Sequence, residues 1–311
     1  MALTSAQNRD VPPARPGEFA ELRLGDRIRL RTPVVLAPMA GITNGPFRVL
    51  CRRFGEAVYV SEMITARGLV EGNRRTRELC RFLPEEAPRS LQLYGSEPRW
   101  LEEAARILVG EGLVDHLDLN LGCPVRKVTA AGGGAAIPYR PRLLARLCGA
   151  LRRGTDGAIP WTVKMRLGID DEHLTYLTAG RVAEQEGAAA VGLHARTAAQ
   201  LYDGRARWEH IGELQRSVSV PVLGNGDVLE AQDALRLMRE TGCGGVIVGR
   251  GCLGRPWLFR ELEAVFAGRE PPDPPRFGEV RDLCLEHARL LCAFFGPELG
   301  IRQMRKHATW A

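Results

Sequence analysis

Short apolar runs recur eight times along this chain, and stretches of helical character separate them. Strands are expected at Val34–Met39, Ala57–Met63, Ser90–Tyr94, His116–Cys123, Trp161–Arg166, Ala190–Arg196, Pro221–Asp227 and Gly245–Arg250. Helices are expected at Gly45–Phe54, Pro98–Gly110, Pro141–Arg153, Leu174–Gln185, Trp208–Ser217, Leu229–Arg239 and Pro256–Phe266, with Arg74–Phe82 the weakest candidate. Strands that alternate with helices are typical of parallel sheets, so eight repeats predict an α/β fold, a (β/α)8 TIM barrel.

An open, doubly wound sheet is the competing architecture for such a pattern. It is disfavoured because no G-x-G-x-x-G loop follows the first expected strand, where Ala37–Gly41 reads Ala-Pro-Met-Ala-Gly. The barrel domain is expected to span residues 22–268. It includes a small hairpin around Gly25 and Asp26 that could close one end of the barrel.

Three further segments flank the expected barrel. Residues 1–21 are polar and rich in proline, so we expect a loose tail that is neither a signal peptide nor a membrane span. Residues 269–276 form a proline-rich linker. Residues 277–311 have a helical apolar stripe, and Ile301–Trp310 resembles the start of a further helix. One or two helices cannot bury their own apolar faces, so this C-terminal helical region is expected to pack on the barrel or to be incomplete.

Cysteine spacing and charge limit the class of function. The eight cysteines include no C-x-x-C pair, which argues against a disulfide scaffold or a metal site and favours free thiols in a reducing cytoplasm. The net charge of +6 is compatible with an acidic partner such as RNA or phosphate. A mildly basic protein without such a partner fits the charge equally well. Nothing in the sequence requires more than a monomer.

Polar residues end the expected strands, and in a barrel these ends converge on one mouth. They are Pro38 and Met39, Glu62, Gln92 and Tyr94, Asn120 and Cys123, Lys164 and Arg166, His194 and Arg196, Asn225 and Asp227, and Gly249 and Arg250. A single lysine or histidine in a strand is often a satisfied core or rim residue. So many polar strand ends together predict a site.

Glycines follow the last two expected strands, within Gly224–Asp227 and Gly249–Gly251. The loops after strands seven and eight are the common phosphate site of these barrels, and Arg250 offers a planar set of donors. Tight turns alone would also explain the glycines. An isoalloxazine ring attached to the phosphate would suit donors such as Lys164, Gln92 and the Pro38–Ala40 backbone.

Cys123 ends the expected fourth strand and is soon followed by Arg126 and Lys127. A thiol at this place can be a nucleophile, which must lose its proton, or a general acid, which must keep it. The two cations would favour the thiolate if they approach the sulfur, and an apolar pocket would favour the thiol. A buried structural cysteine is the third interpretation.

Several motifs, in order from about Val34 to Phe259, resemble those of the bacterial tRNA-dihydrouridine synthases. They are Val34–Thr43, Leu119–Pro124 with Lys127 and Val128, Val163–Gly168, Leu193–Thr197, and Gly224–Asp227 with Gly249–Gly251. The resemblance implies an FMN-dependent cytoplasmic enzyme that uses NADPH to reduce the C5–C6 bond of particular uridines in tRNA. It implies Cys123 as the proton donor. It implies that FMN is bound by Pro38, Met39, Ala40, Gln92, Lys164, His194, Asn225, Gly226, Asp227, Gly249 and Arg250.

The resemblance also implies a tRNA interface. A uridine must be splayed out of folded tRNA to reach the barrel mouth. Asn120, Arg126, Lys127 and Arg196 are expected to contact the substrate. Residues 277–311 would begin the helical tRNA-binding domain, in which Met304–His307 resembles the opening of a basic helix.

Two other functions fit part of this pattern. A flavin barrel could act on a free pyrimidine or another small unsaturated substrate, although the appended basic helical region favours a large one. An RNA-binding barrel without catalysis is the other alternative. The presence of Cys123, Lys164 and His194 argues against it.

Overall fold

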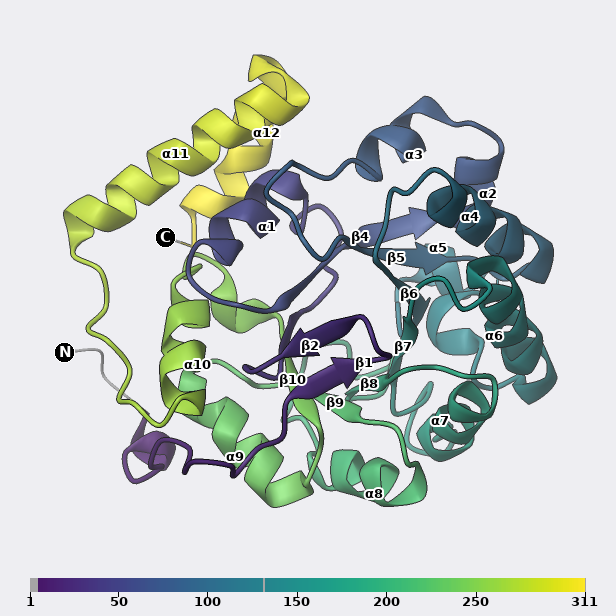
Figure 1. Cartoon of the computed structure of the whole chain (residues 1–311), viewed down its shortest axis with the longest axis horizontal. Coiled ribbons are helices and arrows are strands. Elements are labelled where there is room, and N and C mark those ends of the chain that lie inside the picture. Colours follow the sequence, from purple (N-terminus) through teal and green to yellow (C-terminus); the bar gives the residue numbers. More distant parts are fainter. Residues whose placement is uncertain (1–4, 131, 311) are drawn as a thin grey trace.

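A computed structural model describes residues 5–130 and 132–310 of the chain. Among these residues, eight parallel strands close into a barrel in the order β10-β3-β4-β5-β6-β7-β8-β9 (Figure 1). The strands are β3 (Val34–Leu36), β4 (Val58–Thr65), β5 (Ser90–Tyr94), β6 (His116–Leu121), β7 (Trp161–Arg166), β8 (Val191–His194), β9 (Val222–Asn225) and β10 (Gly245–Val248). The predicted TIM barrel is confirmed, and each expected strand overlaps one of these.

Helices surround the barrel. They are α1 (Gly45–Arg52), α2 (Ala66–Val70), α3 (Arg74–Leu79), α4 (Pro98–Gly110), α5 (Arg126–Thr129), α6 (Pro141–Thr155), α7 (Tyr176–Gln185), α8 (Glu209–Ser217), α9 (Ala231–Thr241) and α10 (Leu258–Phe266), with the 3-10 turns η1 (Ala6–Asn8), η2 (Gly134–Ala136) and η3 (Arg250–Cys252). Local signals set their ends. The Asn44 side chain caps α1 by accepting from the Phe47 amide at 3.2 Å, and Pro46 lies in its first turn.

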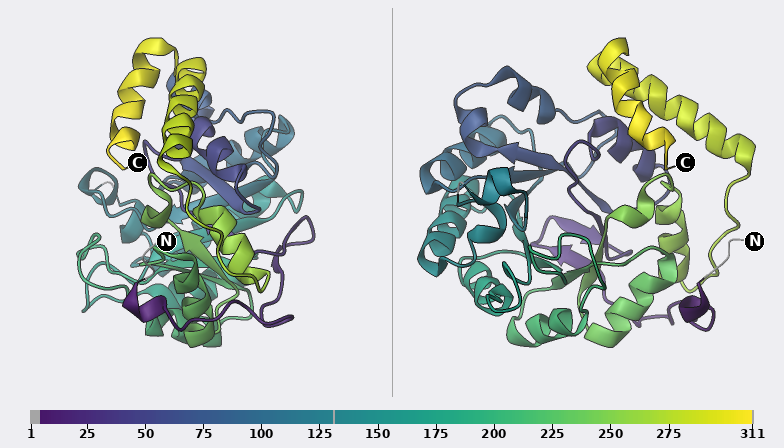
Figure 2. Two further views of the ribbon diagram at one scale, coloured as in Figure 1. Left: turned by 90° about the vertical axis from the view of Figure 1, so that its left-hand side faces the viewer. Right: turned by 180° about the vertical axis from the view of Figure 1, so that it is seen from behind.

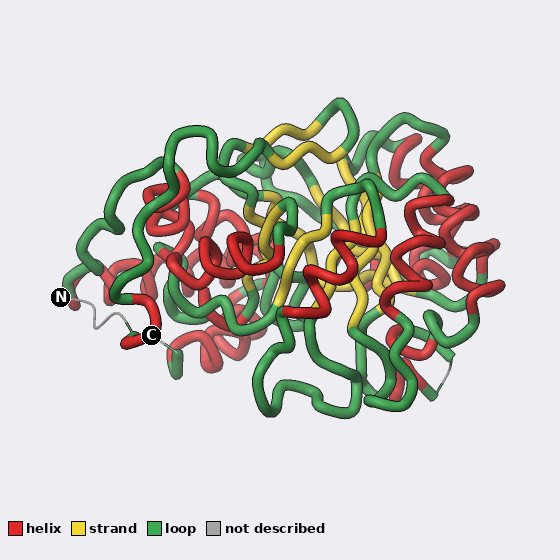
Figure 3. The backbone as a smooth tube through the Cα atoms, turned by 90° about the horizontal axis from the view of Figure 1, so that it is seen from below, coloured by secondary structure: helices red, strands yellow, loops and turns green. Residues whose placement is uncertain are grey.

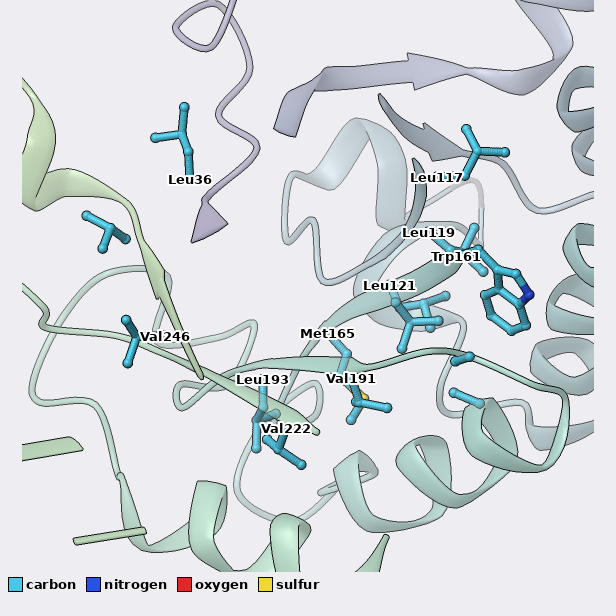
Figure 4. Close-up of a cluster of buried hydrophobic side chains, with 14 of the residues drawn as sticks. Leu36, Leu117, Leu119, Leu121, Trp161, Met165, Val191, Leu193, Val222 and Val246 are labelled. Carbon is cyan, nitrogen blue, oxygen red and sulfur yellow. The ribbon is translucent and has the colours of Figure 1, made fainter. Parts of the chain in front are cut away.

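The main core lies between the barrel and the helices. Leu117, Leu119 and Leu121 alternate along β6 and point outward, where they join apolar side chains of other barrel strands, among them Met165 and Leu193 (Figure 4). The residues between these leucines therefore point into the barrel.

A separate apolar cluster fills one end of the barrel interior. The hairpin of β1 (Leu22–Leu24) and β2 (Ile28–Leu30) places Leu24 and Ile28 against Val58 and Ile247 of the barrel strands. The hairpin lies at one end of the strands and long loops lie at the other (Figure 3). It closes the N-terminal end of the barrel, so the open mouth is at the C-terminal end.

The N-terminal segment is ordered where the structure describes it. Asn8 is buried, and its Nδ2 donates to Glu230, the N-cap residue of α9, at 2.7 Å and to Asp233, in the first turn of α9, at 2.8 Å. Arg239 of α9 binds Glu18. Residues 5–21 thus differ from the loose tail expected from composition, because their partners are more than 200 positions away in the chain. Residues 1–4 lie outside the described residues.

Two long helices follow residues 269–276, which contain no helix or strand in the described structure. They are α11 (Phe277–Phe295) and α12 (Pro297–Ala308), and they pack beside α1 (Figure 2). Helix α12 begins earlier than the expected Ile301. Gly300 permits the close approach of the two helices, because a Cβ there would lie 2.6 Å from the Cys292 backbone. Phe277, Leu285 and Ile301 remain exposed.

The eight cysteines are free thiols. No three His, Cys, Asp or Glu side chains in the described ranges are grouped so as to bind a metal ion. None of the described helices has the length and apolar character needed to cross a membrane.

Candidate active site

A cavity of about 490 Å³ opens at the C-terminal mouth of the barrel. Apart from Arg126 and Lys127, all the residues expected to act in catalysis or to bind cofactor or substrate line it: Pro38, Met39, Ala40, Gln92, Asn120, Cys123, Lys164, His194, Arg196, Asn225, Gly226, Asp227, Gly249 and Arg250. The strand-end residues Glu62 and Tyr94 do not line it. The lining residues converge because parallel strands place their C-terminal ends at one face of the barrel. Arg126 and Lys127 instead lie on α5, a short helix whose side chains are exposed beside this mouth.

Cys123 is half-buried at the tip of β6. The side-chain oxygen of Asn120 accepts hydrogen bonds from the backbone amides of Gly122 at 3.2 Å and Cys123 at 2.9 Å. Asn120 therefore fixes the turn that presents the thiol to the cavity. Its own Nδ2 donates to the Gln92 side-chain oxygen at 2.7 Å.

Lys164 points inward from β7, and its Nζ donates to the Asn225 side-chain oxygen at 2.9 Å. Burial lowers the pKa of Lys164 to about 8, with the Arg166 charge acting in the same direction and Asp118 opposing it. Asn225 is fixed in turn by a bond from its Nδ2 to the Ile247 carbonyl. The result is a cation on the cavity wall that can donate to an anionic ligand.

His194 is a neutral imidazole. Burial first, and then the positive charges of Lys164, Arg166, Arg196 and Arg250, hold its pKa far below the usual range. Arg196 Nη1 lies 3.4 Å from His194 Nε2, and a guanidinium can only donate. His194 Nε2 is therefore the acceptor, and the ring proton is on Nδ1. His194 can thus offer one N–H to a ligand without adding charge.

Asp227 anchors the arginines beside the β9 and β10 loops. It accepts from Arg196 Nη2 at 2.7 and 2.8 Å, from the Ala206 amide at 2.7 Å and from Arg250 Nη2 at 3.5 Å. The buried Arg196 also donates to two backbone carbonyls, so its contacts are with the protein itself. Arg250, by contrast, is nearly half exposed.

The geometry of the loop after β9 requires a glycine at position 226. Gly226 has φ +125° and a Cβ there would lie 2.5 Å from Ala206 Cβ, so only glycine fits.

Arg166 and Tyr202 also line the cavity. Arg166 donates to the carbonyls of Thr197 at 2.9 Å, Leu201 at 2.7 Å and Gly122 at 3.1 Å, and so connects the loop after β8 to the turn before Cys123. Arg166 was expected, with Lys164, among the residues at the strand ends, and their two-residue spacing places both on the inner face of β7. Tyr202 lies in a long loop, and no pattern in the sequence indicated it.

The cavity fits the flavin mononucleotide that the resemblance implies. Lys164, Gln92 and the backbone amide of Ala40 supply donors around the cavity, because Pro38 has no N–H and the Met39 amide donates to Thr43 Oγ1 at 3.0 Å. Met39, Met63 and Leu253 supply apolar wall. The amides of the β9 and β10 loops and the half-exposed Arg250 suit a phosphate.

Comparison with known proteins agrees with this geometry. The model of the dihydrouridine synthase family matches residues 35–311. A probable tRNA-dihydrouridine synthase of Mycobacterium tuberculosis (strain ATCC 25618 / H37Rv) is 55% identical over 298 residues, which cover 93% of this chain and 76% of the relative. The tRNA-dihydrouridine synthase B of Pseudomonas aeruginosa is 39% identical over 278 residues, which cover 89% of this chain and 82% of the relative.

Among solved structures, histamine dehydrogenase from Rhizobium sp. 4-9 superposes with a TM-score of 0.58 at 13% sequence identity. The match covers 89% of this chain and 50% of that protein. At this identity the likeness concerns the barrel fold alone.

Proposed function

The chain belongs to the dihydrouridine synthase family, and on that premise we propose that it is a tRNA-dihydrouridine synthase. It reduces the C5–C6 double bond of particular uridines in tRNA to 5,6-dihydrouridine, with FMN as cofactor and NADPH as reductant. The observation that best supports this is the single cavity that gathers Cys123, Lys164, His194 and Arg250 at the barrel mouth. We further propose that it acts as a monomer in the cytoplasm, where its substrate is found.

FMN would be bound by the residues that line the cavity wall. Lys164, Gln92 and the backbone of Pro38–Ala40 would contact the ring, together with His194 and Asn225. The backbone amides of Gly226, Asp227 and Gly249 and the side chain of Arg250 would hold the phosphate, while the Asp227 carboxylate orients Arg250. When bound, the flavin supplies the hydride for C6 of the uracil ring. The Lys164 cation would stabilise negative charge on the ring and would exclude other cations from the site.

Cys123 would give a proton to C5 of the uracil. This role requires a thiol that keeps its proton, and among the described residues no basic side chain accepts a hydrogen bond from Cys123 Sγ. Arg166 lies beside this turn, since its Nε donates to the carbonyl of Gly122, the residue before Cys123, at 3.1 Å.

The uridine would enter beside Tyr202 and Leu201, which are both about half exposed at the cavity edge. We propose that Arg126 and Lys127 meet tRNA phosphates outside the cavity, since they are exposed on α5. Asn120 would contact the uracil through its second Nδ2 proton, which in the structure makes only a weak contact with Met63 Sδ at 3.7 Å, because its other polar positions are used within the protein. Arg196, also expected to contact substrate, would instead act by fixing Asp227 and the loop around it.

Two measurements test the proposal. The purified protein is expected to be yellow from bound FMN, and its NADPH-reduced flavin should be reoxidised by unmodified tRNA and not by free uridine. A colourless protein without FMN affinity would overturn the enzymatic proposal. Equal reaction with free uracil would support a small-molecule substrate instead of tRNA.

A further inference from the structure

A continuous series of buried polar side chains runs through the barrel interior between β5, β6 and β7. Its members are Ser90, Gln92, His116, Asp118, Asn120 and Thr162, and each is less than 10% exposed. The inward direction of His116, Asp118 and Asn120 follows from the alternation of the outward leucines of β6. Ser90 and Gln92 on β5 and Thr162 on β7 are joined to them by hydrogen bonds. Asp118, in the middle of this series, takes no part in the chemistry proposed above.

The lower half of the series consists of Ser90, His116 and Thr162, and it ends on Asp118. Thr162 Oγ1 lies 2.5 Å from Asp118 Oδ1, and a carboxylate can only accept, so Thr162 donates. The Thr162 oxygen then accepts from His116 Nε2 at 3.1 Å, and His116 Nδ1 accepts from Ser90 Oγ at 2.7 Å. Burial lowers the pKa of His116 to about 3, which leaves a single ring proton, as this order requires.

The upper half also ends on Asp118, from the opposite direction. Gln92 Nε2 donates to Asp118 Oδ2 at 2.6 Å, which turns the Gln92 oxygen toward Asn120. Asn120 Nδ2 donates to that oxygen at 2.7 Å, which turns the Asn120 oxygen toward the amides of Gly122 and Cys123. The orientation of the Gln92 amide thus depends on its acceptor Asp118. The orientation of the Asn120 amide depends on its acceptor Gln92 and on the two backbone amides that donate to it.

Reversal of these amides would be unfavourable. A rotated Asn120 would place its NH2 group against two backbone N–H groups, so three donors would meet without an acceptor. Leaving a buried donor unpaired costs about 1 to 3 kcal/mol. The two backbone amides and the acceptor at position 118 therefore favour the same orientations of Asn120 and Gln92, and loss of that acceptor would leave Gln92 Nε2 as the unpaired donor.

We propose that Asp118 is a positioning residue for Cys123. By accepting from Gln92, it orients Gln92 and Asn120 so that Asn120 holds the backbone of Cys123 and keeps the thiol at one place in the cavity. The inference rests on the proposed function, in which Cys123 must meet a substrate carbon. It assigns the effect to the hydrogen-bond acceptor at position 118 and not to its charge.

Three variants test whether the acceptor at position 118, its charge or the rest of the buried series positions Cys123. Asp118→Leu removes the acceptor at similar size. Asp118→Asn keeps an acceptor for Gln92, while its NH2 group can donate to Thr162 if the His116 ring proton moves to Nδ1. Thr162→Val removes the lower half of the series only. We therefore expect the leucine variant to be impaired, and the asparagine and valine variants to behave like the wild type.

The readouts are the two half-reactions and the reactivity of the thiol. In Asp118→Leu, flavin reoxidation by tRNA should fall roughly 10- to 100-fold, and at least about tenfold more than flavin reduction by NADPH. Alkylation of Cys123 by iodoacetamide in the flavin-bound protein, followed by peptide mass, should change several-fold. If the leucine variant does not fold, Asp118→Ala removes the same acceptor without added bulk.

The outcomes distinguish this inference from the proposed function. Unchanged thiol alkylation and reoxidation in the leucine or alanine variant would overturn it, as would equal damage in Asp118→Asn, which would assign the effect to charge. Equal damage in Thr162→Val would indicate general packing. A wild-type flavin that tRNA cannot reoxidise would overturn the proposed function, while the alkylation measurement would still test the position of Cys123.

Discussion

Lys306, near the end of the last helix, donates a hydrogen bond to the backbone carbonyl of Gly41, in the loop that lines the cavity beside β3. The amide of the same Gly41 donates to the Glu62 carboxylate, so two opposite charges fix the two polar groups of one residue. Gly41 has φ +76°, a conformation that glycine adopts readily. The C-terminal helices are thereby connected directly to the loop expected to hold the flavin.

Lys306→Met should lower the affinity for FMN, because it releases the loop of residues 38–41 on one side. Loss of a hydrogen bond from a charged group that is partly exposed corresponds to roughly a threefold to tenfold rise in the FMN Kd. Fluorescence titration of the apoprotein with FMN measures this. Arg302→Met removes an exposed charge from the same helix and is the matched control. An unchanged FMN Kd in Lys306→Met would mean that the loop does not depend on α12.

The buried ion pair between Arg48 and Glu86 should be required for stability. Both side chains are 1% exposed, Arg48 Nη2 donates to Glu86 Oε1 at 2.9 Å, and Arg48 Nη1 donates to the Thr43 carbonyl at 2.7 Å. Arg48→Met leaves the Glu86 charge buried and unpaired, which should cost about 3 to 5 kcal/mol of unfolding free energy. Arg74→Met breaks the exposed pair with Glu78 and should cost less than about 1 kcal/mol. Denaturant unfolding measures the loss of unfolding free energy in the two variants, and an equal loss in both would contradict the prediction.

The barrel was predictable because its signals are local. Outward leucines alternate with inward polar residues along His116–Cys123. Glycine or proline ends most of the runs, so nearby residues alone predict where most of the strands end. The site at the mouth followed from the same reasoning, since parallel strands place their C-terminal ends together.

Other features depend on contacts between distant parts of the chain. Asn8 is buried against Glu230, and Arg48 pairs with Glu86. No local sequence pattern indicates that Glu230 or Glu86 is the partner. The basic segment Met304–His307 illustrates the same limit. Its charges are visible in the sequence, but the packing of α12 decides that Lys306 meets Gly41 while His307 is buried.

Cys123→Ala should separate the two halves of the reaction. The variant is expected to retain FMN and to oxidise NADPH, since the thiol is proposed to act only on the uracil. It should form no dihydrouridine, because the proton for C5 has lost its donor. Chemical detection of dihydrouridine in tRNA, together with absorbance of NADPH, measures both. Cys284→Ala, at a half-buried cysteine of α11 that does not line the cavity, is the control. Full dihydrouridine formation by Cys123→Ala would remove the thiol from the mechanism.

His287 and His307 form an aromatic cluster with Phe47, where the C-terminal helices pack on α1. The two imidazole centroids are 4.4 Å apart, and His307 stacks on Phe47 at 5.4 Å. Both side chains are buried, and neither Nε2 has a hydrogen-bond partner in the described part of the chain. Burial lowers the pKa of His287 to about 4 and that of His307 to about 3, and for His307 the neighbouring His287 adds to this.

Mild acid should therefore release α11 and α12 from the barrel. Both pKa values lie below the value of 6.5 for an unburied histidine, so the released state binds more protons. The attachment is fully stable above about pH 6.5 and weakens as the pH falls toward 4, by on the order of 3 kcal/mol for His287. Proteolysis within residues 269–276 as a function of pH measures the release. His307→Phe preserves the stacking on Phe47 and should move the onset of cleavage to lower pH, whereas His173→Gln, at an exposed histidine, should not. Cleavage with the same pH dependence in His307→Phe and the wild type would exclude His307 as a cause of the release.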